Sequence, residues 1–120
     1  MARPDGPVLV VDDNVEVREA LARLLQIRGY PVVTACDGQE ALDYLEKGGK
    51  ASLVVLDIFM PRLDGRLLRA KLSQDAGLAR IPVIVFSVAG GETLPDVVGI
   101  VHKADPDRLL GLIERAQHQD

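Results

Sequence analysis

The sequence predicts a single α/β domain built around an open, parallel β-sheet. The first observation is a recurrence of short apolar runs rich in Val and Ile, typical of buried parallel strands: Val8–Val11, Val32–Ala35, Leu53–Leu56, Pro82–Phe86 and Val97–Val101. The second is that segments with helical spacing of apolar residues separate most of the runs, which favours parallel pairing in one sheet. The third is that polar residues follow four of the runs directly. Because ligands bind outside the carboxyl ends of parallel strands, we expect the function at that edge of the sheet.

Length, composition and charge limit the kind of protein. The chain has 120 residues, 48% of them hydrophobic and only four aromatic, so one domain over residues 1–120 with an aliphatic core is expected. The net charge of −4 argues against a nucleic-acid-binding surface. No apolar stretch reaches the roughly 18 residues of a membrane span, and residues 1–7 are too few and too polar for a signal peptide. The expected location is therefore cytoplasmic, without contact to a membrane.

Cysteine usage agrees with a reducing compartment. Cys36 is the single cysteine, so no internal disulfide can form. It directly follows the run Val32–Ala35, and free cysteines are usually buried. We therefore expect Cys36 to be a buried, inert thiol.

Two helices are predicted in the first half of the chain. The first is expected to begin after Asn14, a good N-cap, and to stop at Gly29, which tolerates left-handed backbone geometry. Its buried stripe comprises Val17, Leu21, Leu24 and Leu25. The second is predicted from about Gln39 to Glu46 and ends at Gly48 and Gly49. Its inward residues are Ala41, Leu42 and Leu45.

Two further helices are predicted in the second half. Asp64 is expected to cap the earlier one, whose inward residues are Leu67, Leu68 and Leu72. Asp105 is expected to cap the last helix, with Pro106 at its first position, where a missing N–H costs nothing. The buried stripe of the last helix comprises Leu109, Leu110, Ile113 and Ala116.

The connection between the last two strands is too short for a normal helix. Nine residues, Val88–Asp96, join them, whereas a parallel crossover with its helix usually takes at least about ten to twelve. The segment also holds Gly90, Gly91 and Pro95, which disfavour helix. A helix at this place is predicted to be shortened to one turn or replaced by an irregular loop.

Five polar residues are expected to meet at the carboxyl edge of the sheet: Asp12, Asp13, Asp57, Ser87 and Lys103. Three carboxylates in one place repel one another unless a cation lies among them, and oxygen ligands with room for water suit Mg²⁺. Lys103 would add a positive charge for phosphoryl oxygens, and Ser87 a hydroxyl donor. Asp57 would then be a nucleophile of the kind used in aspartyl-phosphate chemistry.

Each of these residues has a structural explanation when it is taken alone. An Asp after a strand is often a turn or capping residue, a lone Ser is an ordinary loop residue, and a lone Lys is usually a solvated charge. The placement of fitting groups at four strand ends favours the functional interpretation of the set. His102 and His118, in contrast, lack the spacing of a metal site.

With these residues in place, the whole chain closely resembles the receiver domain of two-component response regulators. The resemblance lies in the acidic pair of VLVVDDN, the segment DIFMPRLDG from Asp57 to Gly65, the hydroxyl of VIVFS and the lysine of GIVHK. It implies a flavodoxin-like fold, a doubly wound sheet in the order 2-1-3-4-5 flanked by helices. It also implies a phosphoacceptor signalling protein of bacterial type, without an enzymatic activity of its own beyond self-phosphorylation from a donor.

The resemblance also implies a role for each residue of the carboxyl edge. Asp57 would accept a phosphoryl group from a sensor histidine kinase or a phosphotransfer protein. Mg²⁺ would be held by Asp12, Asp13, Asp57 and the backbone carbonyl of Phe59. Ser87 and Lys103 would bind the phosphoryl oxygens. Phosphorylation would draw Ser87 inward and reshape a face that binds a downstream protein.

Three departures from the family pattern fall on that signalling face. Ile100 stands three residues before the lysine, where the family usually has Tyr or Phe. Ala104 follows the lysine where the family usually has Pro, so a cis bond is not expected. With the short crossover, these changes suggest that phosphorylation chemistry survives while the output is atypical.

The lifetime of the phosphorylated form is a further expectation. In the family, the residues two past the phosphoacceptor and two past the hydroxyl influence attack by water. Phe59 and Ala89 occupy these positions, and neither side chain can hydrogen-bond a water. Slow autodephosphorylation is therefore expected.

Other functions fit less well. The main alternative is a receiver-like module that binds proteins without phosphorylation. A haloacid-dehalogenase-type phosphatase needs a second Asp where Phe59 stands, and no glycine-rich nucleotide motif follows the first strand. The chain has no room for an output domain, so it is expected either to act alone, as a monomer or weak dimer, or to be part of a longer protein.

Overall fold

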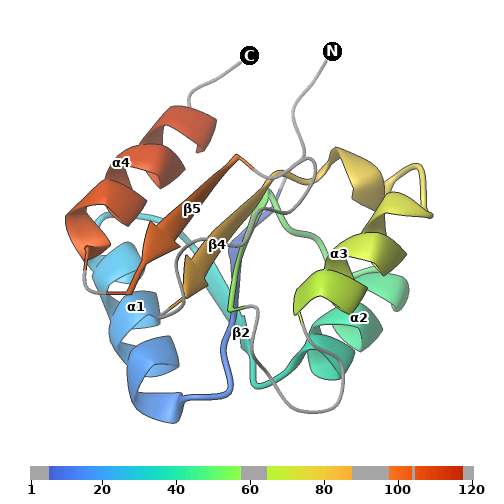
Figure 1. The fold of residues 1–120 in the computed structure, drawn as a ribbon, viewed down its shortest axis with the longest axis horizontal. Helices are drawn as coiled ribbons and strands as arrows, with labels where there is room; N and C mark the ends of the chain where they lie inside the picture. Colours follow the sequence, from blue (N-terminus) through green and yellow to red (C-terminus); the bar gives the residue numbers. More distant parts are fainter. Residues whose placement is uncertain (1–5, 58–64, 88–97, 104, 118–120) are drawn as a thin grey trace.

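The computed structural model describes residues 6–57, 65–87, 98–103 and 105–117 and has the predicted α/β architecture. Five parallel strands form one sheet in the order β2-β1-β3-β4-β5. Helices cover both faces of this sheet (Figure 1). The predicted fold class and strand order are therefore confirmed.

The elements follow the predicted order closely. The strands are β1 (Val8–Val11), β2 (Val32–Ala35), β3 (Leu53–Leu56), β4 (Val83–Ser87) and β5 (Gly99–His102). The helices are α1 (Val15–Ile27), α2 (Gly38–Glu46), α3 (Gly65–Ser73) and α4 (Pro106–Gln117), with a short 3-10 helix η1 (Leu78–Arg80). The main difference is in β5, which is predicted from Val97 but begins at Gly99, because parallel pairing with Ile84 starts there.

Each face of the sheet carries its own half of the core, because side chains alternate along a strand. Leu9 and Val11 of β1 pack on one face with residues of α2 and α3. Val8 and Val10 pack on the other face with residues of α1 and α4. Figure 1 shows the same division, with α1 and α4 on one side of the sheet and α2 and α3 on the other. The three central strands, β1, β3 and β4, are therefore buried on both faces, as their unbroken apolar runs predict, whereas the edge strands β2 and β5 are partly exposed.

Local signals set the helix ends. The Asn14 side chain accepts hydrogen bonds from the backbone N–H groups of Glu16 and Val17 at the start of α1. Gly29 and Gly48, after α1 and α2, have positive φ values of 90° and 94°, which only glycine adopts easily. The Asp105 carboxylate accepts from the N–H of Arg108 at 3.3 Å and caps α4 as predicted.

Two side chains do not lie where the sequence predicts. Cys36 is exposed, because it follows β2, an edge strand with a neighbour on one side only. Leu67 is 52% exposed whereas Leu68 is buried, because adjacent helical residues point about 100° apart and only one of the two can face the core. The predictions that Cys36 and Leu67 are buried are therefore wrong, whereas the prediction for Leu68 is confirmed.

Several predictions fall on residues outside the described ranges. They concern the Asp64 cap, the Val88–Asp96 crossover with its shortened or irregular helix, and Ala104. Among the described residues, no helix combines the length and the apolar character that crossing a bilayer requires.

Candidate functional site

The sheet brings four of its strands together at one edge, each with a polar residue at its carboxyl end. Asp12 and Asp13 follow β1, Asp57 follows β3, Ser87 ends β4, and Lys103 follows β5. The strand pairing continues into these residues: the N–H of Asp57 donates to the Val11 carbonyl at 3.1 Å. Likewise, the N–H of Lys103 donates to the Ser87 carbonyl at 3.0 Å. The backbone register of the sheet therefore fixes where these side chains start.

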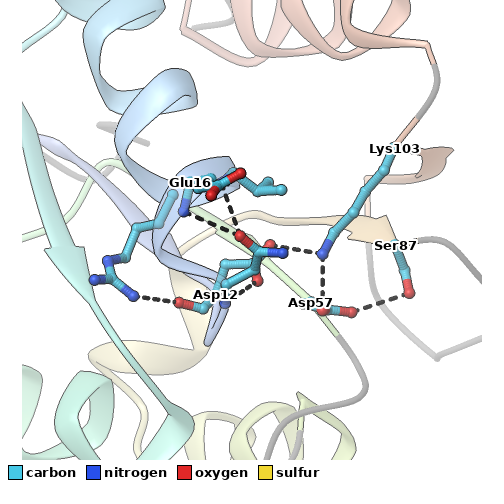
Figure 2. Close-up of polar contacts among 8 residues, drawn as sticks. Asp12, Glu16, Asp57, Ser87 and Lys103 are labelled. Atoms are coloured by element: carbon cyan, nitrogen blue, oxygen red, sulfur yellow. Dashed lines mark hydrogen bonds and ion pairs between the residues drawn. The ribbon is translucent and has the colours of Figure 1, made fainter.

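Asp57 lies at the centre of the site, with a different donor on each carboxylate oxygen. The Ser87 hydroxyl donates to Asp57 Oδ1 at 3.0 Å, and Lys103 Nζ donates to Oδ2 at 3.0 Å (Figure 2). Asp57 is 5% exposed and Ser87 is fully buried. A buried carboxylate is costly unless it is paired and hydrogen-bonded, and here both conditions hold.

Lys103 bridges two carboxylates from different strands. Its Nζ lies 2.9 Å from Asp12 Oδ2 and 3.0 Å from Asp57 Oδ2. Burial by itself lowers the pKa of Lys103, but the hydrogen bonds and negative charges of Asp12 and Asp57 outweigh it and raise that pKa above the usual 10.5. The ammonium group therefore stays charged at neutral pH.

The three aspartates form a cluster that fits a divalent cation. Asp12, Asp13 and Asp57 each offer a carboxylate oxygen, and the three oxygens lie within 4.8 Å of one another. Asp13 is exposed, whereas Asp12 and Asp57 are buried, so one side of the cluster opens to solvent. Hard oxygen ligands with access for water suit Mg²⁺, and the donor set fits this ion. Phe59, whose carbonyl is the fourth predicted ligand, lies outside the described residues.

Comparison with known families agrees with this geometry. The profile of the response regulator receiver domain matches residues 8–110, which includes all five residues of the site. The chain belongs to this family. It is therefore a receiver domain of two-component signalling systems, and the resemblance inferred from its motifs is confirmed.

Individual relatives support the same assignment. The receiver domain is 39% identical over 98 residues to a probable transcriptional regulator, ycf27, of Cyanophora paradoxa, covering 82% of this chain and 39% of that protein. It is 37% identical over 112 residues to response regulator RR06 of Streptococcus pneumoniae, covering 90% of this chain and 50% of that protein. The chain thus spans about two fifths to one half of the length of these relatives. That all of residues 1–120 form one domain stays a prediction.

A solved structure of similar fold carries ligands. It is the response regulator TrrA of Thermotoga maritima in complex with Mg²⁺ and beryllium fluoride. The likeness has a TM-score of 0.82 and 27% sequence identity, and it covers 93% of this chain and 99% of that chain.

Two contacts of the receiver domain's acidic site are not apparent from the sequence. The N–H of Asn14 donates to Asp12 Oδ1 at 2.9 Å, and Arg18 Nη1 donates to the backbone carbonyl of Asp12 at 2.8 Å. The sequence marks Asn14 only as a helix cap. It gives no signal for Arg18, because an arginine on a helix is normally an exposed charge.

Proposed function

We propose that Asp57 is the phosphoacceptor of this receiver domain. The observation that carries the proposal is the arrangement around its carboxylate, with Ser87 on one oxygen, Lys103 on the other and two more aspartates within 4.8 Å. A nucleophilic carboxylate, a charge for the transferred phosphoryl group and a cation site are the parts that phosphoryl transfer needs.

In the proposed reaction an oxygen of Asp57 attacks the phosphorus atom of a phosphohistidine on a sensor kinase or a phosphotransfer protein. The new O–P bond forms as the N–P bond of the donor breaks, and the electron pair of that bond returns to the imidazole. Lys103, which lies 3.0 Å from Asp57 Oδ2, would neutralise charge on the phosphoryl oxygens. The Ser87 hydroxyl, which donates to Asp57 Oδ1, would donate to a phosphoryl oxygen instead.

The metal ligands would be Asp12, Asp13, Asp57 and the carbonyl of Phe59. When bound there, Mg²⁺ would supply positive charge that balances the three carboxylates and the incoming phosphoryl group. The oxygen-only donor set and the solvent access at Asp13 support this choice of ion.

Redirection of the Ser87 hydroxyl is the proposed origin of the signal. Ser87 ends β4, and its carbonyl accepts from Lys103 after β5, so a shift at Ser87 reaches the neighbouring strand directly. The partner of the changed face would be a downstream protein. Since relatives described as transcriptional regulators are more than twice as long as the matched region, we infer that any DNA binding resides outside these residues.

One observation favours a second candidate, a module that binds proteins without phosphorylation. Ile100 lies in β5, paired with Val85, at the position where the family usually has an aromatic residue. An aliphatic side chain there cannot act as an aromatic switch, so the output is expected to be atypical even when Asp57 is phosphorylated.

The deciding experiment is the intact mass of the 120-residue protein after incubation with acetyl phosphate and Mg²⁺. A gain of one phosphoryl group is expected, and it should be absent from Asp57→Asn and when Mg²⁺ is removed. Folded wild-type protein that gains no mass would favour the phosphorylation-independent module.

The same assay tests the lifetime of the phosphorylated form. We propose slow autodephosphorylation, because neither Phe59 nor Ala89 can hydrogen-bond an attacking water. The double variant Phe59→Asn with Ala89→Glu is expected to lose the phosphoryl group faster. Rapid loss from the wild-type protein would contradict the proposal.

A further inference from the structure

Arg18 connects helix α1 to the end of strand β1. It lies at the end of the first turn of α1, where its backbone N–H donates to the Asn14 carbonyl at 2.9 Å. Its side chain is half-buried, and Nη1 donates to the Asp12 carbonyl at 2.8 Å. This contact returns from the helix to the first residue after the strand. It therefore closes the turn that carries the acidic pair.

Asp12 is held at each of its polar atoms. Its N–H donates to the Ala35 carbonyl at 3.2 Å, and its two carboxylate oxygens accept from the N–H of Asn14 and from Lys103. Arg18 holds the remaining atom, the carbonyl oxygen. Figure 2 shows the dashed contacts that leave the Asp12 carboxylate and carbonyl, with Asp57 and Lys103 beside them.

The Asp12 carbonyl matters because it belongs to the same peptide group as the N–H of Asp13. A peptide group is planar, so fixing its oxygen fixes the plane from which Asp13 departs. Asp13 is exposed, and the packing around it is correspondingly sparse. The orientation of this one peptide therefore affects the relative placement of two carboxylates in the cluster.

We propose that Arg18 is a positioning residue for the metal site, acting through the Asp12 carbonyl to hold Asp12 and Asp13 in the arrangement that accepts Mg²⁺. This role rests on the proposed function of the acidic cluster. Groups that orient the ligands of a metal, without touching the metal, commonly change its affinity about 10–100-fold.

The charge of Arg18 makes the sign of the effect informative. A guanidinium group near a cation site repels the cation, so a purely electrostatic role predicts tighter Mg²⁺ binding when the charge is removed. A positioning role predicts weaker binding, because the Asp12–Asp13 peptide becomes free to rotate. The two explanations therefore predict changes in opposite directions.

The test is Mg²⁺ titration calorimetry on the 120-residue protein and its variants. Arg18→Ala is expected to weaken Mg²⁺ binding about ten-fold. Arg23→Ala is the matched control, because Arg23 is an exposed arginine of the same helix. This variant also removes one positive charge. Its dissociation constant for Mg²⁺ should stay within about two-fold of the wild-type value or fall slightly. Arg18→Lys, which keeps the charge and a donor, should show an intermediate loss.

The outcomes separate this role from the proposed function. Arg18→Ala with unchanged or tighter Mg²⁺ binding, in a wild type that binds normally, would overturn the role of Arg18 alone. A wild type that binds no Mg²⁺ would overturn the proposed function and the role of Arg18 together. Should Arg18→Ala fail to fold, Arg18→Lys against Arg23→Lys carries the test, and equal affinities of this pair would overturn the role.

Discussion

At the scale of single residues, Lys103 is the cation that keeps the acidic site together. Its ammonium group lies within 3.0 Å of both Asp12 and Asp57, two carboxylates that are almost fully buried. Without it, those carboxylates would face each other in a region of low dielectric. Lys103 thus contributes to folding as well as to the proposed chemistry.

Replacing Lys103 with Met should lower the free energy of unfolding in chelator-containing buffer by about 1–3 kcal/mol, because two buried carboxylates lose the positive charge that they share. The loss should shrink when Mg²⁺ is added, since the ion supplies the missing charge. Urea unfolding with and without Mg²⁺ measures both values. Lys71→Met, at an exposed position of α3, is the control. A loss of the same size in both buffers would contradict this account.

Cys36 shows how one hydrogen bond can control the reactivity of an exposed thiol. Its Sγ lies 3.3 Å from Glu40 Oε2. The hydrogen bond to Glu40 raises the pKa of Cys36 above the usual 9.0, with smaller contributions from burial and from the negative charges of Glu40 and Asp37. Because the thiolate is the reactive form, alkylation should be slow at neutral pH. Its rate should increase with pH, with a midpoint above pH 9.0.

Glu40→Gln should lower the pKa of Cys36 and therefore speed its reaction with iodoacetamide at mildly alkaline pH. The control is Asp43→Asn, which removes the same charge from an exposed position of the same helix. The alkylation rate, followed by intact mass across a pH series, gives the pKa of each variant. Equal rates for the two variants would show that the contact with Glu40 does not set the reactivity.

At the scale of elements, α1 depends on its first turn. Asn14 accepts from Glu16 N–H at 3.0 Å and from Val17 N–H at 3.1 Å. Asn14→Ala should lower the free energy of unfolding by about 0.5–2 kcal/mol, because these donors lose their acceptor. Asn14→Ser, which keeps a capping oxygen, should recover most of that loss in the same urea titration. An alanine variant as stable as the serine variant would be the contrary result.

The elements were predictable where one strong pattern decides. Buried parallel strands need apolar residues on both faces, so β1 and β3 appear in the sequence with their observed bounds. The sequence pattern predicts the burial of a side chain less well where that burial depends on neighbouring elements. Leu67 and Leu68 are indistinguishable by type, and only the angle between them on α3 makes one exposed. The exposure of Cys36 follows from the place of β2 at the sheet edge, which no local pattern indicates.

The candidate site was predictable for a related reason. Parallel strands all end at the same edge, so Asp12, Asp57, Ser87 and Lys103 are brought together by topology rather than by local sequence. The hydrogen bond from Arg18 to the Asp12 carbonyl depends on the rotamer of Arg18 and on the course of the turn between β1 and α1. Such a contact requires coordinates, because the sequence pattern of an amphipathic helix is satisfied without it.

At the scale of the whole molecule, the two half-cores share one sheet. Leu72 lies fully buried in the half beneath α2 and α3, and Ile113 lies fully buried in the half beneath α1 and α4. Leu72→Ala and Ile113→Ala should each lower the free energy of unfolding by about 2–5 kcal/mol. Unfolding should stay a single transition, because neither half-core can exist without the strands between them.

Circular dichroism and tyrosine fluorescence followed through the same urea titration test this cooperativity. Tyr30 packs against one half-core and Tyr44 against the other, so the two halves both carry a probe. Transitions that separate in either variant would show that the halves unfold independently.

The amino edge of the sheet has a consequence for how this domain can be joined to others. There, Gln117 at the end of α4 donates to Ser52 Oγ at 2.8 Å, and the N–H of Ser52 donates to the Pro7 carbonyl at 2.9 Å. Pro7 and Gln117 therefore meet beside Ser52, one strand length away from Asp57. A fluorescent label or a host protein grafted through these two positions would leave the acidic pocket accessible to a donor. The positions suited to attachment thus lie at the amino edge of the sheet, and the residues of the acidic site lie at the opposite, carboxyl edge.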